Sequence, residues 1–101
     1  MPRKHTLRHL PAAERDLLSI HDWIAADSPS SAVAFVEKLD TRMGKLQTHP
    51  YLGRIPRHPK LRDYGYRVLV IDAYLAFYRL RGHRVEIHRV VHGSRHLDDL
   101  L

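Results

Sequence analysis

The spacing of hydrophobic residues changes partway along the chain, from helical intervals to the alternation of β-strands. In the first half, apolar residues recur every three or four positions in two stripes, one from Ala13 to Ile24 and one from Ala32 to Leu46. Later, three runs rich in Val, Ile, Tyr and Phe alternate at every second position, over residues 66–71, 73–80 and 85–91. Helices and strands segregated in this way are typical of an α+β fold, in which the helices cover one face of a sheet.

Prolines set the expected ends of the two helices. Pro11 suits a first helical turn, because its fixed φ and missing N–H cost nothing there. The segment Asp27-Ser28-Pro29-Ser30 interrupts the pattern, and Ser30 or Ser31 is expected to cap the second helix. Pro50 requires this helix to end earlier, since the residue before a proline disfavours the helical region. The short break between the stripes predicts an antiparallel helical hairpin.

Short turns join the strands into a three-stranded antiparallel meander. Asp72-Ala73 and Arg81-Gly82-His83 are short enough for hairpins, and Gly82 tolerates a positive φ. The alternating segment Thr6 to Leu10 predicts an N-terminal strand that joins the sheet edge, parallel to a later strand through the helical crossover. Residues 97–101 are expected to form a short C-terminal turn.

The meander also predicts which residues meet the helices. The alternation groups Arg79 with Leu75 and Phe77, and Arg89 with Val85 and Ile87. We expect Phe77 to face the helical hairpin and to be buried there against stripe residues of both helices, namely Ile20, Phe35 and Leu39.

Length and composition bound the remaining possibilities. A chain of 101 residues is one ordinary domain, residues 1–101. It has no cysteine, which excludes disulfide scaffolds, thiolate metal sites and thiol catalysis and fits a reducing compartment. No apolar run approaches a membrane span and no secretory signal follows the basic start, so the cytoplasm is the expected location. The net charge of +6, carried mostly by arginine, favours an acidic partner such as nucleic acid, the ribosome or an acidic protein, or else a solvated cationic surface.

Two constellations could carry chemistry. His88, His92 and His96 recur every four residues, but the Gly93-Ser94 break disrupts a continuous ligand face, so no metal site is expected. Glu86 and His88 fall on the same predicted strand face, where they could act as a general base pair or simply share a hydrogen bond.

A third group of residues is basic. Basic residues gather on the meander and just after it: Arg67, Arg79, Arg81, Arg84, Arg89, His92, Arg95 and His96. A guanidinium on an otherwise apolar strand face needs an anionic partner. That partner is either internal, with Asp63, Asp72 or Glu86 as candidates, or an external anion bound by a concave sheet face.

Five short segments, in order along nearly the whole chain, resemble the RelE/ParE superfamily of bacterial type II toxins. Each segment alone is a weak indicator of the family, but all five in this order are a strong one. The segments are Pro11-Ala12-Ala13-Glu14-Arg15-Asp16-Leu17, His49-Pro50-Tyr51-Leu52-Gly53-Arg54, Gly65-Tyr66-Arg67, Phe77-Tyr78-Arg79 and the stretch 85–95 from Val85-Glu86-Ile87-His88 to Gly93-Ser94-Arg95. The resemblance implies a toxin, without a cofactor, that a cognate acidic antitoxin neutralises in a toxin-antitoxin hetero-oligomer.

The resemblance also divides the possible targets. RelE-like members cleave mRNA on the ribosome with strand cations and a C-terminal Arg and Tyr, whereas ParE-like members poison DNA gyrase. The RelE strand lysines fall at Tyr66 and Val68, the second-strand arginine at Leu75, and the terminal tyrosine at Leu101; Arg95 alone is retained. The chain is therefore closer to ParE-like members, a gyrase inhibitor more than an endoribonuclease. A ribosome-dependent ribonuclease is the alternative, and a non-toxic module that binds antitoxin or DNA is a second one.

These implications assign expected roles to named residues. Target contacts are expected from Arg67, Arg79 and Arg95. A ribonuclease would use Arg67, His92, Arg95 and His96. The antitoxin is expected to fold as a helix in an apolar groove beside the helical hairpin, with contacts from Leu18, Trp23, Phe35 and Arg81.

Overall fold

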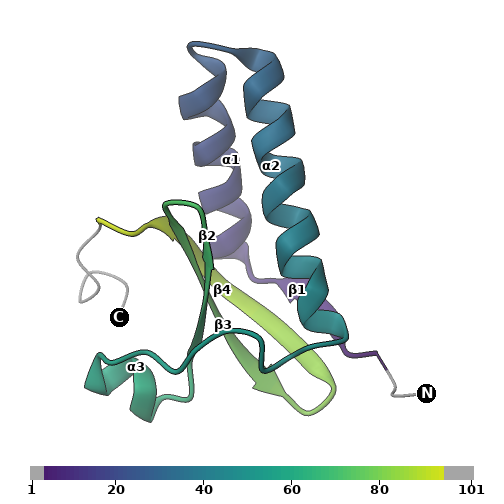
Figure 1. The fold of residues 1–101 in the computed structure, drawn as a ribbon, viewed down its shortest axis with the longest axis vertical. Coiled ribbons are helices and arrows are strands. Elements are labelled where there is room, and N and C mark those ends of the chain that lie inside the picture. The colour runs from purple at the N-terminus through teal and green to yellow at the C-terminus, as the bar shows by residue number, and fades with distance from the viewer. Residues whose placement is uncertain (1–3, 95–101) are drawn as a thin grey trace.

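Helices and strands are segregated along the chain, as the change of period predicts. The computed structural model describes residues 4–94 (Figure 1). Its elements are β1 (Thr6–His9), α1 (Pro11–Ala25), α2 (Pro29–Gly44), a 3₁₀ turn (Lys45–Gln47), α3 (Pro59–Asp63), β2 (Arg67–Ile71), β3 (Tyr74–Arg81) and β4 (Arg84–His92). The α+β class is confirmed; the expected C-terminal turn at residues 97–101 lies outside the described residues.

The four strands form one sheet in the order β1-β4-β3-β2. Strands β2, β3 and β4 pair in an antiparallel meander, and β1 pairs in parallel with β4, from Thr6 opposite Arg84 to His9 opposite Ile87. The helical hairpin is the crossover that makes this parallel pairing possible. The predicted meander and the edgewise, parallel first strand are both confirmed.

Prolines begin both long helices. Pro11 and Pro29 occupy the first helical turns, and Ser28, not Ser30 or Ser31, caps α2, since its side chain accepts a hydrogen bond from the Ser31 N–H at 3.3 Å. The helix begins earlier than predicted because a proline, which interrupts a helix at an interior position, is favoured at the first helical position. Helix α2 ends at Gly44 and the 3₁₀ turn ends at Gln47, before Pro50 as expected.

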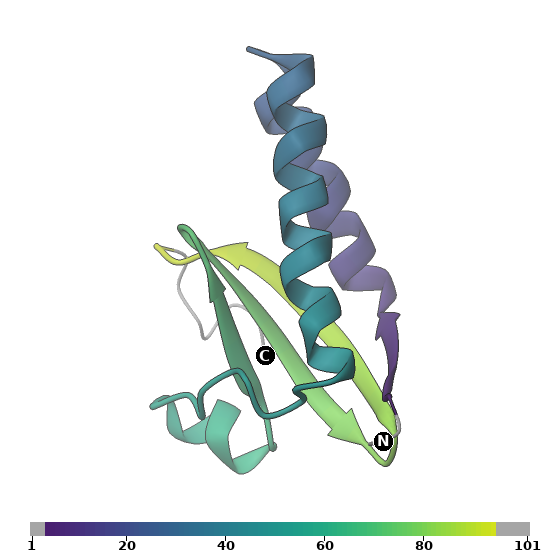
Figure 2. The same cartoon turned by 45° about the vertical axis from the view of Figure 1, so that its right-hand side comes forward.

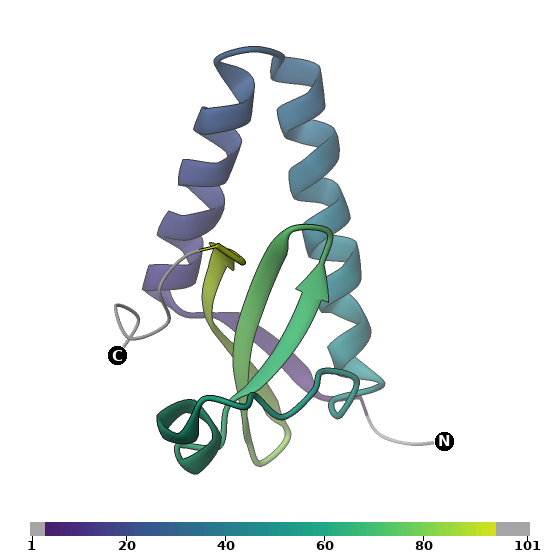
Figure 3. The same ribbon diagram turned by 60° about the vertical axis from the view of Figure 1, so that its left-hand side comes forward.

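One face of the sheet is covered by the helices and part of the other face is covered by the segment that contains α3. The helical hairpin lies along one face. The irregular segment of residues 50–58, which we call the connector, and α3 lie at the foot of the sheet (Figures 2 and 3). The helix-side core includes Ile20, Leu39, Met43, Ala76, Tyr78, Val85, Ile87 and Val90. A second core on the other face, which we call the outer face, consists of Leu61, Val68, Phe77 and Val91 with Tyr66 and Leu75 against it.

The expectation for Phe77 was therefore wrong in direction. Phe77 is buried, but in the outer core with Leu61, while its neighbours Ala76 and Tyr78 pack with the helix-side core. Because part of the outer face is also covered, Leu75 and Phe77 are apolar there just as Ala76 and Tyr78 are on the helix side, and the alternation of β3 does not say which set meets the helices.

A bulge in β4 alters its alternation. Phe77 lies opposite Arg89 and Tyr78 lies opposite Ile87, so His88 is the additional residue. After this bulge Val90, rather than the expected Arg89, continues the helix-side face of Val85 and Ile87.

Candidate functional site

Glu86 anchors a group of arginines where β3 turns into β4. Its carboxylate is buried, with Arg84 Nη2 at 3.1 Å and Arg81 Nε at 3.5 Å. In the sheet register Arg79 and Arg8 are its neighbours on β3 and β1. Of the three internal partners expected for the arginines, Glu86 is the one that serves this purpose in the described sheet.

Tyr66 and His88 extend this network on the outer face. The Tyr66 hydroxyl and His88 Nδ1 are 3.1 Å apart, and the two rings meet edge to face at 5.0 Å. Burial, followed by the charge of Arg79, lowers the pKa of His88, which keeps the imidazole neutral at neutral pH. His88 Nε2 lies 3.8 Å from Glu86 Oε1, too far for a hydrogen bond, and this nitrogen is buried. The Glu86–His88 pair is thus built as part of a packed network and not as an open general base.

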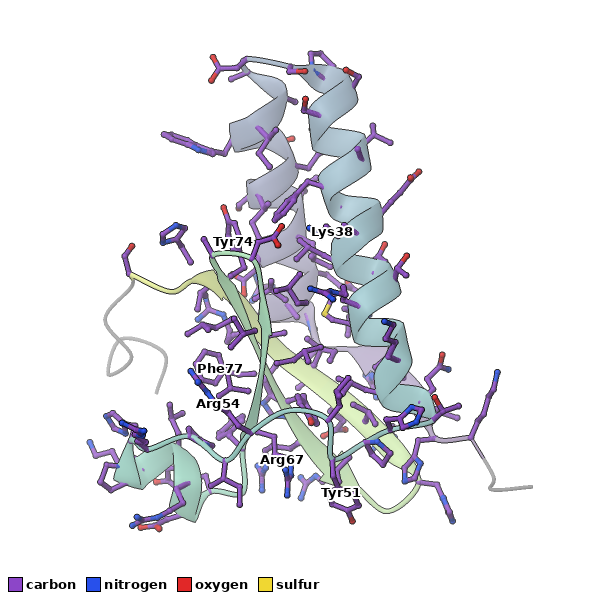
Figure 4. The ribbon with its side chains drawn as sticks, viewed as in Figure 1. Lys38, Tyr51, Arg54, Arg67, Tyr74 and Phe77 are labelled. Carbon is purple, nitrogen blue, oxygen red and sulfur yellow. The ribbon has the colours of Figure 1, made fainter. Side chains whose placement is uncertain are left out.

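Arg67 and Arg79, both predicted to contact the target, lie on opposite faces of the sheet. Arg67 pairs with Tyr78 on the helix side, and its Nη1 donates to the Gly53 carbonyl at 2.8 Å (Figure 4). Its guanidinium also lies over the Tyr51 ring, 4.9 Å from the centroid. Arg79 lies over the Tyr66 ring at 5.5 Å. No single concave face therefore presents both arginines.

The remaining predicted target and ribonuclease residues lie at the C-terminal end. His92 is the last residue of β4, where its Nδ1 is 2.8 Å from Ser94 Oγ and its ring meets Tyr74 edge to face. Arg95 and His96 lie outside the described residues. Among residues 4–94 no group of three or more histidine or acidic side chains is placed to hold a metal ion.

Arg89 is paired with a residue that the sequence reasoning did not consider. Its Nε and Nη2 donate to the two Asp16 oxygens of α1 at 2.8 and 2.9 Å, and the Val90 N–H donates to Asp16 as well. These hydrogen bonds raise the pKa of the Arg89 guanidinium further. Asp72 binds Lys38 and Asp63 binds Arg62, so neither serves the strand arginines as expected.

A groove opens between the end of α2, the connector and β2. It has a volume of about 530 Å³, with an apolar floor that includes Leu52, Leu69 and Val70. Its basic rim, which we call the groove rim, consists of Arg42, Lys45, His49 and Arg54. Strand β2 is the edge strand here, since within residues 4–94 it pairs with β3 and, through one short bridge from Val68, with Arg54. The sequence predicts an apolar groove beside the hairpin, but the four residues expected there are not among those that line this groove.

Tyr78 holds the connector that forms one wall of this groove. Its buried hydroxyl donates to the Pro50 carbonyl at 2.8 Å and accepts from the Gly53 N–H at 2.9 Å. Burial raises the pKa of Tyr78, although the bond from Gly53 and the charge of Arg67 oppose this. Gly53 must be glycine for close approach, because a Cβ there would lie 2.7 Å from the Tyr78 ring.

The four residues expected at the antitoxin interface are not gathered on one surface. Leu18 and Trp23 are exposed on α1, with 63% and 79% of their surface accessible. Phe35 packs against the helix-side core and the Tyr74 ring. Arg81 lies at the β3–β4 turn, at the opposite end of the molecule from the α1–α2 turn (Figure 1).

Comparison with known proteins agrees with this architecture. A chromosomal ParDE toxin-antitoxin system from P. aeruginosa aligns with a TM-score of 0.74 and 23% identity, over 90% of this chain and 98% of the other. The toxin-antitoxin complex RelBE2 from Mycobacterium tuberculosis aligns with a TM-score of 0.63 and 24% identity, over 91% and 94%. At these identities the two structures show a shared fold. No curated protein sequence matches the chain.

A strand, a helical hairpin and an arginine-rich meander define a class of small basic α+β proteins. Within that class, residues 7–97 match the family described as "ParE toxin of type II toxin-antitoxin system, parDE". The chain therefore belongs to this family of type II toxins, which confirms its resemblance to the RelE/ParE superfamily. No helix in the described part of the chain is long and apolar enough to cross a membrane.

Proposed function

We propose that this type II toxin inhibits DNA gyrase and does not cleave ribosome-bound mRNA. The observation that carries the proposal is the chemistry of the outer face. Val68 and Leu75 belong to the apolar outer core, and Tyr66 is bound to His88. The resemblance would require cations at these positions in a RelE-like ribonuclease. Cleavage by 2′-hydroxyl attack needs a base, cations for the phosphate and an acid for the leaving oxygen, and positions 66, 68 and 75 do not supply them.

Two assays run side by side on the purified protein test the target. We expect inhibition of gyrase supercoiling, or accumulation of gyrase on cleaved DNA, and intact mRNA on the ribosome. Arg95→Glu is expected to abolish gyrase inhibition while antitoxin binding stays largely unchanged, because a guanidinium acts as a permanent anion-binding charge. If the protein instead cuts mRNA in the ribosomal A site and His92→Ala or His96→Ala stops the cutting, the ribonuclease is the correct function. If induction does not arrest growth, the chain is a non-toxic binding module.

The antitoxin is proposed to bind the groove through an acidic amphipathic segment. The apolar floor suits the apolar side of such a segment, and the groove rim suits its carboxylates. Exposed charges attract a partner over a distance that salt shortens, so the association rate should fall as ionic strength rises. An association rate that is equal at low and high salt would contradict the charge pairing.

The exposed Leu18 and Trp23 on α1 are proposed as a second antitoxin contact. Large apolar side chains that remain exposed on a helix often mark an interface. Leu18→Ala and Trp23→Ala should each weaken antitoxin binding without loss of folding, which circular dichroism checks. Val33→Ala, an exposed apolar position on α2, is the matched control. Equal affinity of the Leu18 and Trp23 variants and the parent protein would remove α1 from the proposed interface.

A further inference from the structure

On the outer face near the β3–β4 turn, arginines outnumber the carboxylates that could pair with them. Four arginines lie there on three adjacent strands, and we call them the arginine cluster: Arg8, Arg79, Arg81 and Arg84. Glu86 is the one carboxylate on the four described strands. Asp72, at the β2–β3 turn, is bound to Lys38 of α2. One buried carboxylate therefore stands against four guanidinium groups.

Glu86 orients these arginines without using up their donors. It contacts Arg84 at 3.1 Å and Arg81 at 3.5 Å, yet these two side chains remain 47% and 58% exposed. A guanidinium has more N–H donors than one shared carboxylate accepts, so the outward donors stay available to a second anion. Because the buried Glu86 already restrains these arginine side chains, they lose less conformational entropy when they bind a phosphate through two hydrogen bonds.

The aromatic residue next to the cluster is already occupied. Tyr66 has Arg79 over its face and His88 at its edge, with its hydroxyl bound to His88 Nδ1. Proteins that bind single-stranded nucleic acid normally offer open aromatic faces on which bases stack. With that ring occupied, this part of the described surface offers charge and hydrogen-bond donors, which suits the backbone of a duplex.

The cluster also differs from the groove in a way that separates their partners. The groove combines a basic rim with an apolar floor, as an amphipathic protein segment requires. The cluster lies at the other edge of the sheet, on strands β1, β4 and β3, whereas β2 forms the groove edge. A ligand that is charged throughout matches the cluster.

We propose that the arginine cluster binds the phosphodiester backbone of duplex DNA. This inference rests on the proposed function, since gyrase acts on duplex DNA and the cluster would hold the toxin against that DNA. Binding of this kind releases counterions, so the affinity falls linearly with salt on a logarithmic scale, with a slope of about −0.9 for each phosphate contacted.

The experiment measures binding of the purified toxin to a labelled DNA duplex by fluorescence anisotropy across a salt series, without gyrase. The Arg81→Gln/Arg84→Gln double variant should bind more weakly, and its salt slope should become shallower by about two. The double variant removes two cationic partners of the buried Glu86, so a loss of stability is expected, and thermal unfolding checks that the variant is still folded at the assay temperature. Arg15→Gln on the exposed surface of α1 is the control and should retain the parent slope.

The outcomes separate this inference from the function on which it rests. If the double variant keeps the salt slope of the parent protein, or if Arg15→Gln loses as much DNA affinity as the double variant, the cluster is not the DNA site. If a single-stranded RNA of equal length binds more tightly through the same two arginines, duplex DNA is the wrong ligand. Gyrase inhibition is assayed separately. If inhibition persists in a double variant that no longer binds DNA, the cluster binds DNA but does not hold the toxin against the DNA of gyrase, which overturns that part of this inference alone. Absence of inhibition in the parent protein overturns the proposed function.

Discussion

Single side chains in this protein hold segments that have no regular structure of their own. The Tyr78 hydroxyl is the clearest example, because it bonds two backbone groups of the connector, Pro50 and Gly53, from within the sheet. Arg67 adds a third link to the same segment through the Gly53 carbonyl. The wall of the groove therefore depends on side chains of β2 and β3.

Removing the Tyr78 hydroxyl should destabilise the fold and loosen the connector. Tyr78→Phe leaves a buried N–H and a carbonyl without their partner, which costs about 1–3 kcal/mol in the free energy of unfolding. Denaturant unfolding measures this loss, and limited proteolysis should find faster cleavage within residues 50–58. Tyr64→Phe, at an exposed position, is the control and should change neither. Equal effects of the two variants would refute the role of Tyr78.

His88 predicts how the stability depends on acid. Its pKa in the folded protein is lowered from 6.5, so below that pH the unfolded chain binds more protons than the folded one. The contribution of His88 is complete above the unfolded pKa and is lost as the pH falls through the folded pKa. His88→Gln should therefore flatten the loss of stability below pH 6.5, measured by denaturant unfolding at several pH values. His21→Gln on α1 is the control. If the curve of stability against pH for His88→Gln is only shifted parallel to that of the parent protein, with the same slope, the prediction is wrong.

At the scale of elements, α1 is attached to β4 by more than apolar contact. Asp16 takes two hydrogen bonds from Arg89 and one from the Val90 backbone, beyond the point where β1 stops pairing with β4. The carboxylate thus occupies the free edge of β4 and satisfies a backbone donor that would otherwise lack a strand partner. The side chains are 13% and 23% exposed, so the pair is largely shielded from water.

A double-mutant cycle measures this attachment. Asp16→Ala and Arg89→Ala should each cost about 3 kcal/mol in unfolding free energy, because each leaves a shielded charge without its partner. The double variant should lose clearly less than the sum, with a coupling energy of about 1–3 kcal/mol. The exposed pair of Lys38 and Asp72 is the matched control, for which about 0.2–1 kcal/mol is expected. Similar coupling in both cycles would show that Asp16 and Arg89 act as an ordinary surface pair.

The sequence predicts the elements well and the directions of side chains poorly. Element order and the parallel pairing of β1 follow from period, prolines and chain connectivity, which are local or topological signals. The face of Phe77 does not follow, because the middle of β3 packs against an apolar core on each side of the sheet. The partner of Arg89 does not follow either, since the bulge at His88 changes the register and Asp16 is distant in sequence.

At the scale of the whole molecule, the two proposed surfaces use different edges of one sheet. The groove lies along β2, and the arginine cluster lies on β1, β4 and the end of β3. The central strands join them through a packed core on each face. Each surface can therefore be altered by substitution of exposed side chains without a change in the other.

This arrangement predicts that one variant loses antitoxin binding and keeps gyrase inhibition, whereas another loses toxicity and keeps antitoxin binding. Arg42→Glu/Lys45→Glu on the groove rim should weaken antitoxin binding while gyrase inhibition is kept, so expression of the antitoxin no longer rescues growth. Arg81→Gln/Arg84→Gln should weaken toxicity while antitoxin affinity is kept. Titration calorimetry with the antitoxin and a supercoiling assay measure the two properties on the same preparations. A variant pair that loses both properties together would show that the two surfaces overlap.

The parallel pairing of β1 with β4 also sets the order in which parts of this fold can assemble during translation. Thr6 meets Arg84, so the first strand waits for a partner that is synthesised after both long helices and the other two strands. Loop closure over such a separation must precede the contacts that stabilise it, which delays the sheet relative to the helical hairpin. Until β4 has been synthesised, β1 lacks the strand with which it pairs, although the residues of the helical hairpin are already present.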